Sequence, residues 1–135
     1  MRTFGTAFLI VSSLFTAWTS WISLRSPSEF GKSLGYALPG ADGRNEIRAQ
    51  YGGFFLAVTV GSVLALLGII PRHAGLIVNA VVFGGLIAGR LISLAVDGGM
   101  KEYGFVIRVL FLVDATGFVL SIASLLLDPL VAGRG

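Results

Sequence analysis

Four long apolar stretches constrain this chain more than any other feature of its sequence. They cover about residues 3–24, 47–70, 74–96 and 103–127, and each reaches the roughly 20 residues that an α-helix needs to cross the hydrocarbon core of a bilayer. Only helices and closed barrels satisfy their backbone hydrogen bonds in lipid, and these stretches lack the alternation typical of barrel strands. The sequence therefore predicts an all-α membrane protein, an antiparallel four-transmembrane-helix bundle that forms a single domain over residues 1–135.

The composition excludes several classes of protein. Charged residues make up 13% of the chain, against roughly 25% in a soluble domain, so an ordinary soluble protein is excluded. The absence of cysteine excludes disulfides, thiol nucleophiles and cysteine-bound metals. No motif spacing typical of a metal, nucleotide or nucleophile site occurs, and we predict no metal and no cofactor. The net charge of +3 comes from scattered basic residues, so we predict no nucleic-acid partner.

The first apolar stretch follows Arg2 and resembles the start of a signal peptide. It is longer than the apolar part of such a peptide, and no small-residue cleavage site follows it, so we interpret it as a retained span. Four spans place both termini on the same side of the membrane. Basic residues are nearly balanced between the two sides, so the positive-inside rule leaves the orientation open. Trp18 and Trp21 fit an interfacial aromatic belt.

The only long connection runs over residues 25–45. Ser28-Glu29 resembles a helix start, and Phe30, Leu34 and Leu38 recur at helical spacing. We therefore predict a short amphipathic segment on the membrane surface. It would act either as a lid over a cavity or as a connector packed on the mouth of the bundle. Gly35, Pro39-Gly40 and Asp42-Gly43 are predicted to break the chain before the second span.

Small residues recur at four-residue spacing in the middle of the chain. Helices in lipid associate through such residues, because close packing takes the place of hydrophobic attraction. Spans two and three are therefore predicted to form the tight centre of the bundle, or else to join two copies of the chain. The predicted packing positions are Gly53, Ala57, Gly61 and Ala65 in the second span, Gly85, Gly89 and Ser93 in the third, and Gly117 and Ser121 in the fourth.

Several ionisable side chains lie inside or at the ends of these spans, where they are energetically costly and normally face the bundle interior. Antiparallel threading places most of them in one half of the membrane. They would form either structural ion pairs or a pocket for an anionic or carbonyl-bearing headgroup with an apolar tail. Arg108 lies about 120° around its helix from Asp114 and need not face the interior. The predicted cluster comprises Glu46, Arg48, Tyr51, Arg90, Asp97 and Arg108.

Asp114 lies eleven residues into the fourth span, near the middle of the membrane. It would pair with Arg90, form an interhelical hydrogen bond, or act as a general acid or proton relay. Each of the four spans also carries one stripe of polar or small residues. Together these stripes predict a polar seam inside the bundle.

Two segments carry a resemblance to a known family. Residues 45–53 read NEIRAQYGG, and residues 83–93 read FGGLIAGRLIS and are followed by Asp97-Gly98. The chain resembles an uncharacterised family of small bacterial four-span membrane proteins related to the DoxX-like group. The resemblance implies a four-helix bundle in the bacterial inner membrane. It implies no activity, although DoxX-like relatives are linked to respiratory chemistry as accessory subunits, and the redox cysteines of some relatives are absent here.

Two functions fit the sequence. The first is a non-catalytic membrane module that binds a lipid-like or other hydrophobic molecule, or serves as an accessory subunit of a larger membrane complex. The alternative is a small intramembrane enzyme of the isomerase, cyclase or epoxide-opening type. Asp114 or Glu46 would then be the acid, and Arg90 or Tyr51 would stabilise developing negative charge.

Overall fold

The computed structural model describes residues 2–37 and 40–127, which are helical with no strand among them. Four helices in this part are long and apolar enough to cross a membrane, as the hydropathy pattern predicts. The second of these is one continuous helical rod made of three segments. The helices are α1 (Arg2–Arg25), α2 (Pro27–Ser33), α3 (Gly40–Ile47), the π-helical turn η1 (Arg48–Gly53), α4 (Phe54–Leu66), α5 (Arg72–Val96) and α6 (Phe105–Leu127).

The second span begins earlier than the sequence predicted, and the predicted break before it is wrong at residues 40–43. Gly40 adopts a positive φ of 62° and starts the helix. Asp42 then lies in the first turn, where a negative side chain is favoured by the helix dipole. The span also ends earlier, at Leu66, because Gly68 takes a φ of 72° and Ile69 N–H donates to the carbonyl of Leu64. This pair of features is the Schellman arrangement that closes a helix.

A short helix does form in the long connection, as the spacing of apolar residues predicts. It begins at Pro27, one residue before the predicted start, because proline is well suited to the first helical position. Leu34 is buried at its end and Phe30 is half-buried. The ring of Phe30 lies edge-on to Tyr51, 5.1 Å between centroids, so α2 packs on the mouth of the bundle. Leu38 lies outside the described residues.

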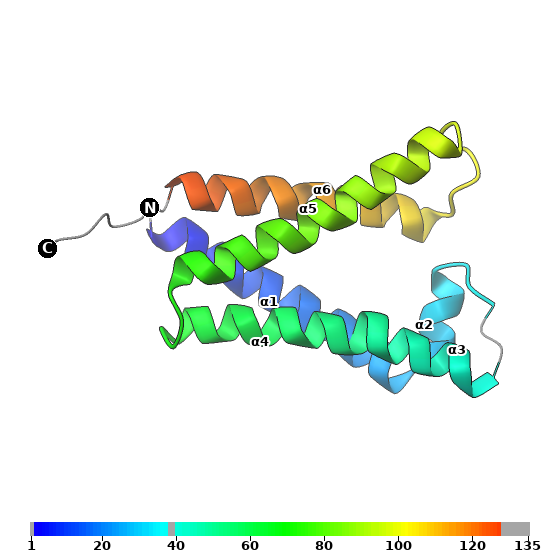
Figure 1. Cartoon of the computed structure of the whole chain (residues 1–135), viewed down its shortest axis with the longest axis horizontal. Coiled ribbons are helices and arrows are strands. Elements are labelled where there is room, and N and C mark those ends of the chain that lie inside the picture. Colours follow the sequence, from blue (N-terminus) through cyan, green and yellow to red (C-terminus); the bar gives the residue numbers. More distant parts are fainter. Residues whose placement is uncertain (1, 38–39, 128–135) are drawn as a thin grey trace, which may run out of the picture.

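The long helices associate as two pairs. The most extensive contacts join α5 to α6 and α1 to α4–η1. The two pairs meet at the end where α1 begins and α6 ends, and they diverge toward the end that carries α2 and α3 (Figure 1). The expectation that spans two and three form the tight centre is therefore wrong, because α4 and α5 contact each other less than either contacts its own partner.

Glycines do bring helices together, at the predicted Gly117 and at two positions that the spacing did not indicate. A Cβ on Gly117 would lie 2.6 Å from the ring of Phe83, and one on Gly75 would lie 2.5 Å from the Cβ of Ala65. A Cβ on Gly52 would similarly meet Leu24 at 2.5 Å. These distances are shorter than any ordinary carbon contact. Glycine at these positions therefore allows α6 to approach α5, α5 to approach α4, and η1 to approach α1.

Most of the small residues predicted to pack in the second and third spans do not do so. A Cβ on Gly61, Gly85 or Gly89 would meet nothing within 4 Å, and Gly53 and Ala57 are exposed. Their four-residue spacing does place them on one face of each helix, but it is another face that packs. Packing of these positions against a second copy of the chain stays a prediction.

The predicted polar seam is confirmed by a row of buried hydrogen bonds between α1, the second span and α5. Asn79 is fully buried, and its side-chain amide donates to Ser62 Oγ at 2.9 Å and to the carbonyl of Gly75 at 2.9 Å. Its side-chain oxygen accepts a hydrogen bond from Ser12. Farther along α1, Thr16 lies 2.8 Å from Thr59, between their hydroxyl oxygens. These buried polar groups are thus satisfied by one another, as lipid requires.

Candidate binding cleft at the diverging end

Two neighbouring cavities lie where the helix pairs diverge. Their volumes are about 740 and 460 Å³, within the range typical of small-molecule sites. Both are lined by Tyr36 and Leu86, so they form the two parts of one cleft, which we call the loop-end cleft. The larger part is bordered by residues 43–55 of the second span, and the smaller part by α5 and α6. The polar residues of its lining are Tyr36, Glu46, Gln50, Tyr51, Arg90, Ser93 and Tyr103.

The π-helical turn η1 determines which residues of the second span face α1 and which line the cleft. A π turn widens the helix by one residue and is frequent at functional sites. The Ser20 hydroxyl donates to the carbonyl of Gly52 at 2.8 Å, and Arg48 Nε donates to the carbonyl of Leu24 at 3.2 Å. Both bonds hold η1 against α1. Tyr51, on the other face of the turn, lines the cleft.

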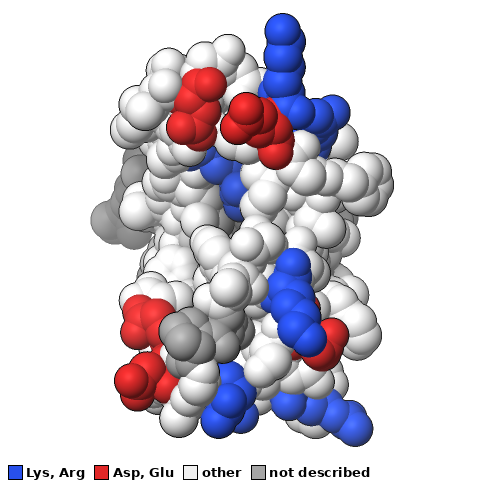
Figure 2. All heavy atoms as spheres, turned by 90° about the vertical axis from the view of Figure 1, so that its right-hand side faces the viewer, with Lys and Arg blue, Asp and Glu red and all other residues white. Residues whose placement is uncertain are grey.

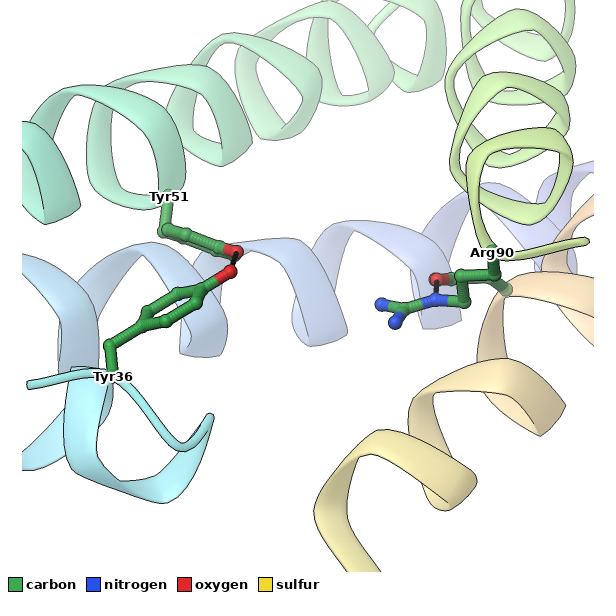
Figure 3. Close-up of polar contacts among 4 residues, drawn as sticks. Tyr36, Tyr51 and Arg90 are labelled. Atoms are coloured by element: carbon green, nitrogen blue, oxygen red, sulfur yellow. Dashed lines mark hydrogen bonds and ion pairs between the residues drawn. The ribbon is translucent and has the colours of Figure 1, made fainter. Parts of the chain in front are cut away.

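Two tyrosines form one polar wall of the cleft. The hydroxyl oxygens of Tyr36 and Tyr51 lie 3.4 Å apart and point toward each other (Figure 3). This distance is longer than the roughly 2.5–3.0 Å usual between hydroxyl oxygens, so the bond is weak. The ring of Tyr51 is held between Phe30 and Phe55, at centroid distances of 5.1 and 6.4 Å. The rings are therefore well positioned, while the hydroxyl protons are available to another acceptor.

An ion pair forms the opposite polar wall. Arg90 Nε donates to Asp114 Oδ2 at 2.5 Å. The guanidinium carbon lies 5.6 Å from the centroid of the Phe111 ring, which stabilises the cation further. Asp114 is 4% exposed in its side chain and Arg90 is 21% exposed. Among the described residues the Nη atoms of Arg90 have no hydrogen-bond partner, and the guanidinium extends toward the tyrosine pair (Figure 3).

The remaining residues of the predicted cluster bind other partners, either on the wall of the cleft or away from it. Glu46 lines the larger cavity and accepts a hydrogen bond from Gln50 at 3.0 Å. Arg108 donates to three loop carbonyls, those of Met100, Lys101 and Tyr103, and so faces away from the seam as its position around the helix predicts. Of the structural ion pairs that the sequence allows, the predicted pair of Arg90 with Asp114 forms, whereas no pairing of Arg48 or Arg90 with Glu46 or Asp97 occurs in the described part of the chain.

Asp97 lies at the exposed end of α5 and binds Tyr103. The Tyr103 hydroxyl donates to the Asp97 carboxylate, and Ser93 Oγ donates to the same oxygen at 3.2 Å. The hydrogen bond to Asp97 raises the pKa of Tyr103 above its ordinary value, because losing the proton would place two negative charges together. Acidic and basic side chains are interspersed over this end of the molecule, with no large patch of one sign (Figure 2).

Some residues of the cleft were missed by the sequence analysis. Tyr36 belongs to a connection in which only the apolar spacing predicts structure, and Gly35 before it, with a φ of 85°, signals the turn. Gly85 and Gly89 were expected to pack a helix. They line the smaller cavity instead, because a missing side chain leaves space as readily as it allows contact. Groups of three or more metal-binding side chains do not occur in the described ranges, residues 2–37 and 40–127.

A match to a known protein family shows which proteins this chain is related to. Residues 5–124 match the family described as a domain of unknown function, DUF4345. The chain belongs to this family. The DUF4345 match includes every residue given above as lining the loop-end cleft, so the cleft lies within the family domain. No curated protein and no solved structure matches the chain.

Proposed function

We propose that this DUF4345 protein is a non-catalytic membrane module that binds a lipid-like molecule in the loop-end cleft. The observation that carries the proposal is the form of this cleft, which combines two connected cavities with a short polar region facing both. Apolar and aromatic side chains make up most of the walls, among them Phe54, Phe55, Leu86 and Phe111. An elongated hydrophobic molecule with one polar end matches such a lining.

The position of the cleft in the fold supports the same proposal. It lies between the two helix pairs, at the level of η1 and the end of α5, in helices that are long and apolar enough to cross a membrane. A molecule dissolved in the bilayer would reach it sideways, without crossing water. Because the helices are held together at the other end by the buried seam, the cleft does not need to close for the bundle to be stable.

The replacement Leu86→Trp tests this proposal. Leu86 borders both cavities, so a larger side chain there should fill the junction between them. We expect native mass spectrometry of protein released from its membrane to show a bound small molecule in the wild type and its loss in Leu86→Trp. Val81→Trp on the same helix is the matched control, because Val81 is 68% exposed and borders neither cavity. Equal retention in both variants, or a bare wild type, would contradict the proposal.

A small intramembrane enzyme is the second candidate, favoured by the carboxylate of Glu46 on the cleft wall. Glu46 and Tyr51 border the same cavity, where they would serve as acid and as hydrogen-bond donor. Asp114 borders neither part of the cleft and is held by Arg90, which makes it the weaker acid candidate. Chemical change of a bound molecule that stops in Glu46→Gln and continues in Asp114→Asn would support the enzyme.

We further propose a location and partners. The resemblance to small bacterial proteins related to the DoxX-like group supports the bacterial inner membrane. Both termini then lie on one side, in agreement with an even number of candidate spans. Membrane lipid is the proposed partner, and a second copy or a larger complex is the alternative. The face that carries Gly53, Ala57 and Gly61 would suit a second copy, and the mass of the intact particle would reveal it.

A further inference from the structure

The charges that border the loop-end cleft do not favour an anion. Among the described residues, Arg90 is the one arginine or lysine on its walls, and Asp114 already neutralises it through the ion pair. Glu46 adds a negative charge on the wall of the larger cavity. Arg48 and Arg108 are directed to backbone carbonyls and border neither cavity. Arg90, Asp114 and Glu46 together carry two negative charges against one positive charge, so the binding of a phosphate or carboxylate beside them would place like charges together in a medium of low dielectric constant.

The cleft is nevertheless rich in hydrogen-bond donors. The Nη atoms of Arg90 extend from one side, and the hydroxyls of Tyr36 and Tyr51 face them from the other (Figure 3). A guanidinium carries donors only, and a tyrosine hydroxyl donates one proton. The site thus offers several donors to acceptors on a molecule that need not carry charge.

We infer that the occupant of the loop-end cleft is an uncharged amphiphile whose polar end carries carbonyl oxygens, with acylglycerols as the chemical class. This inference rests on the proposed function and specifies its ligand. The ester carbonyls accept from Arg90 and the tyrosine pair, and the acyl chains lie along Phe54, Phe55 and Leu86. Asp114 acts as the positioning residue that determines the preference for an uncharged molecule. It neutralises the charge of Arg90 without occupying the cleft.

Competition between two short-chain lipids tests the inference. Dioctanoylglycerol is the uncharged probe, and dioctanoyl phosphatidylglycerol is the anionic probe with the same chains and the same ester groups. Both are added in equal amounts to the full chain in a non-ionic detergent, and native mass spectrometry counts the bound copies of each. We expect the wild type to retain the uncharged probe at least about tenfold better, a ratio that corresponds to about 1.4 kcal/mol.

Charge variants show whether Asp114 sets the preference. Asp114→Asn keeps the shape and an acceptor for Arg90 but removes the negative charge, so the preference should move toward the anionic probe by about tenfold. Glu46→Gln should move it in the same direction, and this variant changes only an exposed side chain, so it remains informative if Asp114→Asn does not fold. Arg90→Gln should weaken both probes. Arg108→Gln is the matched control and should leave the ratio unchanged, because Arg108 lies outside the cleft.

The possible results separate the two proposals. Stronger retention of the anionic probe by the wild type, or a ratio unchanged in both Asp114→Asn and Glu46→Gln, overturns the inference about charge and leaves binding in the cleft standing. Retention of both probes that is unaffected by Leu86→Trp overturns the proposed function itself.

Discussion

Replacement of Asp114 with leucine should destabilise the bundle by about 3 kcal/mol. The variant removes the partner of Arg90 and leaves a guanidinium with no negative charge beside it, and breaking one side of a buried pair costs about 3–5 kcal/mol. The lower end of that range applies because 21% of the Arg90 side chain remains exposed. The free energy of unfolding, measured by titration with dodecyl sulfate in mixed micelles, tests this value.

The opposite single variant should be milder. Arg90→Met leaves Asp114 without its partner, but a carboxyl group becomes neutral when it takes up a proton, whereas a guanidinium stays charged at any accessible pH. The double variant Arg90→Met/Asp114→Leu should recover most of the stability, since apolar residues of similar volume replace buried ion pairs at little cost. Equal losses in both single variants, with no recovery in the double variant, would show that packing rather than charge determines the effect.

The spans and the polar seam could be predicted because each depends on one helix at a time. Twenty or so apolar residues suffice for a membrane helix whatever its neighbours are. A stripe of polar residues likewise marks the inner face of a helix in lipid, and Asn79, Thr16 and Ser62 are all fully buried. These features depend on the lipid that surrounds each helix. The apolar composition of the sequence is enough to indicate that lipid environment.

The choice between two plausible partners could not be predicted in the same way. Arg90 has Asp97 seven residues away on its own helix and Asp114 on the next, and spacing permits either. The contact between α5 and α6 decides for Asp114, which the structure places against Arg90 Nε. Tyr36 was missed for a similar reason, because its role depends on how a connection folds back over η1.

The small residues of the second span show the same limit. They occur on more than one face of the helix, and four-residue spacing selected the face of Gly53, Ala57 and Gly61. The structure packs Gly52 against α1, on a face that the spacing did not select, and Ala65 against α5, at a position that the spacing did select. Which face packs depends on the partner helix, and the spacing alone does not contain that information.

Replacement of Gly117 with alanine should produce the second large effect, a loss of about 1–3 kcal/mol, the usual cost of overpacking a core. The new Cβ would lie 2.6–2.8 Å from three ring carbons of Phe83. Phe83 is 3% exposed, so its ring has little room to move away. The α5–α6 pair would have to separate, and this pair also carries the contact between Arg90 and Asp114. Unfolding in mixed micelles measures the loss.

Gly85→Ala provides the matched control, because it introduces the same methyl group into the partner helix α5. A Cβ on Gly85 meets nothing within 4 Å, and alanine favours a helix over glycine by up to about 1 kcal/mol. We therefore expect Gly85→Ala to be neutral or slightly stabilising, while Gly117→Ala loses stability and Gly117→Ala/Phe83→Leu regains part of it. If the two single variants behaved alike, helix propensity would be the cause, and the close approach of α6 to Phe83 would not contribute to stability.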